Sequence, residues 1–246
     1  VCAAAATGWR ARFAPGIAAR LREAVVIGFP ILATSLVGAW IVASGRVWMG
    51  LFLGDEDVHA WAFTFRVASL LVLLHAVIAT GFAAKLYRMP TRRFDPLAAV
   101  IVGVIAALAA AFILAAPERL TAHWFSKEVA QALDARPATA FVVAQVFFWI
   151  AGAIAEMRVA RARAAWSAAR WGFVAAGGAA CVAFALAARG GLDFRALAAT
   201  LALQQIAMCC ALHLALARRG LPLRRTAAAT LGGGALVVAA ALLAAR

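Results

Sequence analysis

The sequence is poor in charged residues, and acidic residues are the scarcest of them. Only 14% of its 246 residues are charged, against about 25% in a typical soluble domain. Hydrophobic residues make up 66%, and the mean hydropathy is +0.93. This balance indicates a membrane protein rather than a soluble one. Ten acidic residues stand against 24 basic ones, for a net charge of +14. In a membrane protein such an excess indicates contact with anionic lipid and a fixed orientation, not nucleic-acid binding.

The motifs of common enzyme classes are missing as well. The sequence has no P-loop, no G-x-S-x-G and no H-E-x-x-H, and its four histidines are scattered. The cysteines (Cys2, Cys181, Cys209 and Cys210) form no C-x-x-C pair. They are expected to be small apolar packing residues. We therefore expect no catalytic residue, no metal site and no cofactor.

Long apolar runs are what the sequence does contain. Seven of them reach or approach the roughly 20 residues that a helix needs to cross a hydrocarbon core of about 30 Å. A spanning segment must satisfy its own backbone hydrogen bonds, so each run predicts a helix. The expected helices cover 24–45, 58–84, 96–116, 138–157, 165–188, 196–217 and 227–245. The predicted fold is an all-α polytopic membrane protein, with one transmembrane lobe over 24–246.

Three segments outside the predicted helices carry features of their own. A basic lead-in over 1–23 precedes the lobe, and its second half could form a short amphipathic helix on the membrane surface. Between the first two helices the link over 46–57 is amphiphilic and ends in acids, where Asp55 is the expected N-cap. The loop over 117–137 holds Trp124 and Phe125 in positions typical of an interfacial anchor.

The basic residues divide unevenly between the two ends of the predicted helices. One side, with the N-terminus and the loops after helices two, four and six, has 15 basic residues and three acids. The other side has seven of each, and Arg66 and Arg170 lie inside helices. Because cytoplasmic loops are enriched in Lys and Arg, we expect the N-terminus in the cytoplasm and the C-terminus outside.

Two side chains in the second predicted helix are candidates for function. Arg66 lies well inside this apolar run, where a charge costs at least about 2.5 kcal/mol unless it faces protein or water. It could reach back to the interface, or it could bind an anionic group in a hydrated cavity. His75, on roughly the opposite face, could bond to a neighbouring helix or carry a proton.

The fourth and sixth predicted helices carry further polar residues. Gln145, Trp149, Gly152 and Glu156 form one stripe, which should face the bundle or a cavity rather than lipid. The alternative is a packing seam in which Glu156 pairs with a nearby arginine. On the sixth helix, Gln204 and Gln205 lie near mid-membrane, where hydrogen bonding between helices is their expected role.

The acidic run Asp55-Glu56-Asp57 matches the D-x-D pattern with which glycosyltransferases hold a metal and a sugar nucleotide. Acids are also expected at a helix start, whatever their function. A membrane-embedded enzyme of glycolipid assembly is therefore an alternative hypothesis. A non-catalytic membrane scaffold that packs on another subunit is a third.

The stretch 24–88 resembles the second lobe of polysaccharide-biosynthesis flippases, which are related to multidrug-extrusion and murein-lipid flippases. Gly28-Phe29-Pro30 stands near the start of the first helix, after a basic segment. A short outer loop follows, and then a helix with Trp61 and Arg66, as in that family. Trp61 stands where tyrosine is common, and members usually have twelve to fourteen helices in two lobes.

The resemblance implies a transporter of the bacterial inner membrane that flips a polyprenyl-diphosphate-linked oligosaccharide, such as a lipopolysaccharide precursor for the cell envelope. It implies alternating access and a missing N-terminal lobe, a split partner or a second copy. In that picture Arg66 contacts the diphosphate, Gln145 and Gln204 bind sugar hydroxyls, and Glu156 or His75 couples to a proton.

Overall fold

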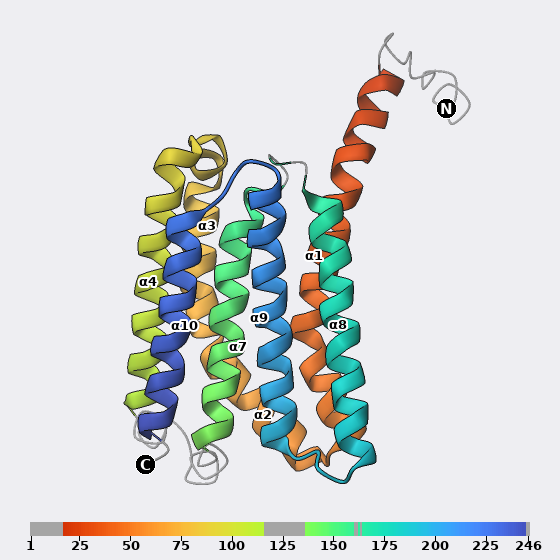
Figure 1. Ribbon diagram of the computed structural model, residues 1–246, viewed down its shortest axis with the longest axis vertical. Coiled ribbons are helices and arrows are strands. Elements are labelled where there is room, and N and C mark those ends of the chain that lie inside the picture. The colour runs from red at the N-terminus through yellow and green to blue at the C-terminus, as the bar shows by residue number, and fades with distance from the viewer. Residues whose placement is uncertain (1–16, 116–135, 160–161, 163, 245–246) are drawn as a thin grey trace, which may run out of the picture.

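The chain is an all-α, multi-pass membrane protein, as the sequence predicts. Figure 1 shows its computed structural model, which describes residues 17–115, 136–159, 162 and 164–244; this part contains helices and no strand. Five of its helical segments are long and apolar enough to cross a membrane, and Ala140–Glu156 is a shorter apolar helix. The helices are Ile17–Phe52 (α1), Asp55–Ala68 (α2), Leu70–Arg88 (α3), Thr91–Leu114 (α4), Arg136–Glu156 (α7), Ala165–Ala188 (α8), Phe194–Arg218 (α9) and Arg224–Ala244 (α10).

The helices stand side by side along one axis. Helix α10 packs on α4 and α7, α7 on α9, α9 on α8, and α8 on α1. Helix α2 runs obliquely between the lower ends of α1 and α7, and α3 lies behind α4 and α10 in this view. The central helix is α7, and every residue from 142 to 148 is buried. An all-round apolar helix belongs in such a surrounded position.

The first helix is longer than the sequence predicts at both ends. The expected link over 46–57 is helical as far as Phe52 and again from Asp55, so only Leu53 and Gly54 link α1 to α2. Trp48 and Phe52 pack edge-on against Phe184 of α8, with ring centres 6.0 and 5.2 Å apart, and this contact holds the extra turns. At its other end, α1 begins at Ile17 and is one continuous helix that projects past the bundle, not a separate surface helix.

The second predicted helix, 58–84, is divided into α2 and α3 at Ser69. The Ser69 hydroxyl donates to the backbone oxygen of Arg66 at 2.6 Å. A hydroxyl that bonds to the backbone one turn earlier competes with the helical pattern and bends the chain. At the start of α2 the N-cap is Gly54 rather than Asp55, which is the first helical residue.

The basic end predicted for the cytoplasm is one physical end of the bundle. The C-terminal ends of α3, α7 and α9 meet the N-terminal ends of α4, α8 and α10 there (Figure 1). Its exposed cations include Lys85, Arg88, Arg92, Arg93, Arg218, Arg219, Arg224 and Arg225. The loop residues Trp124 and Phe125 lie outside the described residues.

Candidate functional site

Gln145 is a fully buried amide in the middle of α7. Its side chain is 1% exposed, and neither its oxygen nor its nitrogen has a hydrogen-bond partner among the described residues. An unsatisfied buried amide costs about 1–3 kcal/mol. An all-apolar helix core would avoid this cost, so Gln145 is a candidate for a role other than packing.

The register of α7 and α9 places Gln205 opposite Gln145. Both helices run in the same direction, and a Cβ on Gly152 would lie 3.9 Å from the Cα of Cys209. Gln145 lies seven residues before Gly152, and Gln205 lies four before Cys209, so both stay on the facing sides. At 1.5 Å per residue the two glutamines differ in height by about 4.5 Å, less than one turn. Gln205 is 2% exposed, and its amide oxygen also lacks a partner among the described residues.

Gln204 points to a different side of α9. It lies one turn before Met208, whose sulfur is 2.9 Å from a Cβ built on Gly172 of α8. Gln204 therefore faces α8 and α1 rather than α7. It is 3% exposed, with its amide oxygen unpartnered among the described residues. The residue that faces Gln145 is thus Gln205, for which the sequence predicts only hydrogen bonding between helices.

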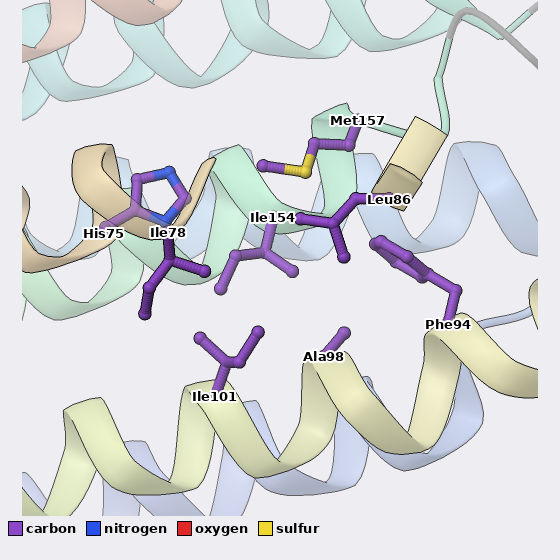
Figure 2. A pocket seen from close by; sticks show the side chains of 8 residues that line it. All are labelled: His75, Ile78, Leu86, Phe94, Ala98, Ile101, Ile154 and Met157. Atoms are coloured by element: carbon purple, nitrogen blue, oxygen red, sulfur yellow. The ribbon is translucent and has the colours of Figure 1, made fainter. Parts of the chain in front are cut away.

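His75 lies at one end of a pocket between α3, α4 and α7 (Figure 2). The pocket is small: its free volume is about 10 Å³, which is about the room that one water molecule needs. Its other lining residues are all apolar: Ile78, Leu86, Phe94, Ala98, Ile101, Ile154 and Met157. His75 is half-buried, and its Nδ1 has no hydrogen-bond partner among the described residues. One polar atom in an apolar pocket fits a proton-carrying group or a single hydrogen bond to a ligand.

Arg158 closes the bundle behind the other end of this pocket. Only 1% exposed, it donates from Nη2 to the Leu86 oxygen at 2.9 Å and from Nη1 to the Tyr87 oxygen at 3.3 Å. Its guanidinium also lies over the ring of Phe94, 3.8 Å from the ring centre. The carbonyl groups that end α3 are thereby satisfied by a positive charge, which the helix dipole favours at this end.

Asp95 makes a second link at the same end of the bundle. Its carboxylate accepts hydrogen bonds from the backbone N–H groups of Arg225 (3.0 Å) and Thr226 (2.9 Å), and from the Thr226 hydroxyl (2.8 Å). Thr226 also donates to the backbone oxygen of Asp95 at 3.1 Å. A side chain of α4 thus caps the first turn of α10.

The other predicted site residues lie away from the buried amides of Gln145 and Gln205. Arg66 is exposed in the last turn of α2, and Glu156 is the half-buried last residue of α7. Asp55 and Glu56 are exposed at the start of α2. Within the described ranges, no three residues among His, Cys, Asp and Glu come together as metal ligands would.

Arg158 was missed because it follows the end of α7 directly, where the sequence shows only another loop cation. The position of Gln205 opposite Gln145 was missed because helix register is not visible in the sequence. Comparison with known proteins gives no match, whether to family models, to curated proteins or to solved structures. The class defined here is therefore an all-α, multi-pass membrane protein with unsatisfied polar groups inside its helix bundle.

Proposed function

We propose that the chain is one lobe of a membrane transporter that flips a polyprenyl-diphosphate-linked oligosaccharide across the bacterial inner membrane by alternating access. The observation that carries this proposal is Arg66. It is exposed on the lobe, inside the membrane-spanning segment Asp55–Phe82, about 16 Å along the helix from Asp55. A charge on that surface is costly against lipid, so the surface should meet water or protein.

An aqueous cavity shared with a second lobe or a second copy would meet this need. In such a cavity Arg66 would hold the diphosphate as a charge-assisted hydrogen-bond donor. The residues near Arg66 on α2 and the break at Ser69 would then border the path of the substrate. The resemblance of the Gly28-Phe29-Pro30 and Trp61–Arg66 segments to flippases supports the same reading.

The two buried glutamines support a lobe in which α7 and α9 separate during transport. Gln145 and Gln205 lie between α7 and α9, and their amide groups have unsatisfied atoms in the present conformation. A conformation that separates these helices would offer their amides to sugar hydroxyls, which are matched donors and acceptors. The uptake and release of a proton by His75 or Glu156 would be coupled to this conformational change.

Reconstituted vesicles test the proposal. The full chain is placed in liposomes with a fluorescent polyprenyl-diphosphate oligosaccharide, and a membrane-impermeant quencher measures how fast label reaches the outer leaflet. We expect flipping faster than in empty liposomes, and a loss of at least about tenfold in Arg66→Ala. The matched control is Arg170→Ala, whose exposed arginine near the start of α8 donates to the Trp166 oxygen at 3.4 Å.

Two results would overturn this function. One is a flipping rate no higher than in empty liposomes, both for the chain alone and when it is co-expressed with its neighbouring membrane genes. The other is an unchanged rate in Arg66→Ala, which would remove Arg66 from the substrate path. Metal-dependent turnover of a sugar nucleotide that is lost in Asp55→Asn would instead favour the enzyme hypothesis.

A further inference from the structure

A second pocket lies between the first turns of α7 and the last turns of α10. Its free volume is about 120 Å³, far larger than that of the pocket beside His75. Its lining is apolar throughout, with Ala140, Phe141 and Ala144 from α7 and Val237, Val238, Ala241 and Leu242 from α10. Both helices reach it at the lower end of the bundle in Figure 1, away from the basic end. None of the residues discussed above as functional lines this pocket.

The pocket exists because short side chains face each other where the two helices are held apart. Toward the middle of the bundle, the Phe148 ring of α7 lies so close to Gly234 of α10 that a Cβ there would clash with it. The side chains at such a contact set the distance between two helices. Nearer the lower end, α7 presents Ala140 and Ala144, and α10 presents Ala241. Their methyl groups leave part of the space between the helices unfilled.

The pocket has a buried floor and an exposed lip. Ala140, Ala144 and Val237 form the floor, and all three are buried. Val238 and Leu242 form the lip, and they are 51% and 65% exposed. Because α10 is long and apolar enough to cross the membrane, side chains exposed on its outer surface meet the bilayer. The pocket therefore opens toward lipid rather than toward the interior of the bundle.

The depth of the pocket places it in one leaflet of the bilayer. Helix α10 carries Arg225 in its first turn, at the basic end, and Val237 and Leu242 lie about 18 and 26 Å further along the helix. A hydrocarbon core is about 30 Å thick, so its midplane lies about 15 Å from either surface. The pocket is therefore beyond the midplane, in the leaflet away from the basic end.

Hydrocarbon is the chemistry that suits this space. A water molecule in a cavity needs several polar partners, and the lining side chains offer none. An apolar cavity of about 150 Å³ stays dry and takes benzene or xenon, so a pocket of about 120 Å³ holds hydrocarbon of similar size. An apolar cavity that stays empty lowers the stability of a protein. The hydrocarbon available at the lip is the acyl chains of the surrounding lipid.

We propose that this pocket binds one acyl chain of a phospholipid in the leaflet away from the basic end. A short segment of the chain, about the size of benzene, lies on the floor formed by Ala140, Ala144 and Val237. The rest of the lipid extends past the lip into the bilayer. The proposal rests on the membrane-spanning fold, and it is independent of the flippase function.

Photolabelling in vesicles tests the proposal. The full chain is reconstituted in phosphatidylglycerol and phosphatidylcholine, with a minor fraction of phosphatidylcholine that carries a diazirine in the middle of one acyl chain. After illumination, tandem mass spectrometry locates the label. We expect label on the floor residue Val237 as well as on the lip, because only a chain inside the pocket reaches this buried side chain. Val100 and Val104, exposed on α4, show the labelling that ordinary lipid contact gives. Label on the lip and on α4 without label on Val237 would overturn the proposal.

Variants that fill the pocket test whether the label depends on its free space. Ala144→Leu should lower the label on Val237 at least about fivefold, because the leucine takes the space of the chain. The matched control is Ala107→Leu, on the exposed surface of α4, which should leave that label unchanged. If Ala144→Leu does not fold, Ala241→Leu fills the same space from α10. Unchanged label on Val237 in a filling variant would overturn the proposal. Loss of that label to polyprenyl phosphate, added as a minor component, would overturn the acyl assignment and assign the pocket to an isoprenoid chain.

Discussion

The guanidinium carbon of Arg158 lies 3.8 Å from the centre of the Phe94 ring, while its Nη2 is 2.9 Å from the Leu86 oxygen. One buried cation, in the turn after α7, therefore contacts both the end of α3 and the start of α4. A cation over an aromatic ring contributes about 0.5–2 kcal/mol, more when water is excluded. The carbonyl groups at the end of α3 accept hydrogen bonds from the same guanidinium, since carbonyl groups at a helix end depend on partners outside the helix.

The first prediction concerns this cation. Arg158→Met keeps an apolar stem of similar length but leaves the Leu86 and Tyr87 oxygens without a donor, so it should lower the stability of the protein by about 1–3 kcal/mol. Thermal unfolding in detergent measures the change, with Arg219→Met as control, since Arg219 is exposed after α9. If the two variants unfold at the same temperature, Arg158 does not hold α3 in place.

Asp95 provides the second prediction. Asp95→Ala removes the acceptor for two N–H groups of α10 and for the Thr226 hydroxyl, and should cost about 1–2 kcal/mol, as loss of an N-cap does. Asp95→Asn keeps one acceptor oxygen and should cost less. A double-mutant cycle with Thr226→Val should give a coupling of at least about 0.5 kcal/mol. Additive effects would show that the two side chains act independently.

The sequence predicts the helices well because lipid forces each long apolar run to satisfy its own backbone. It does not predict the break at Ser69, since a serine inside an apolar run is compatible with a continuous helix and only its bond to the Arg66 oxygen marks the bend. Side-chain partners that depend on register are also hidden. Gln205 rather than Gln204 lies on the side of α9 that faces Gln145, because Gly152 packs at the level of Cys209.

The third prediction uses two glycines of the same helix. A Cβ on Gly234 would lie 2.5 Å from the Phe148 ring of α7, while one on Gly232 would meet nothing within 4 Å. Gly234→Ala should therefore force α10 away from α7 and cost about 1–3 kcal/mol, as overpacking does. Gly232→Ala should be neutral or stabilise by up to about 1 kcal/mol, because alanine favours helix. Chemical unfolding of both variants makes the comparison, and equal stabilities would contradict this packing.

The fourth prediction separates stability from function at Gln145. Gln145→Leu replaces an amide with two unsatisfied atoms by a hydrocarbon of similar size, so it should raise the unfolding temperature. Under the proposed function the same change should lower flipping, because the amide is lost to the substrate. Gln205→Leu should behave in the same way. A destabilised Gln145→Leu would show that the amide is satisfied in the membrane and belongs to the packing.

The last prediction concerns which end of the bundle faces the cytoplasm. Gly191 and Pro222 are exposed turn residues at opposite ends, Gly191 between α8 and α9 and Pro222 between α9 and α10 (Figure 1). The cysteine content is first removed by changing Cys2, Cys181, Cys209 and Cys210 to Ala, and then Gly191→Cys or Pro222→Cys is introduced. A membrane-impermeant maleimide should label Gly191→Cys on intact cells and Pro222→Cys only after permeabilisation, because the arginine-rich end is retained inside. The reverse pattern would contradict the orientation and place the basic turn of α3 and α4 outside the cell.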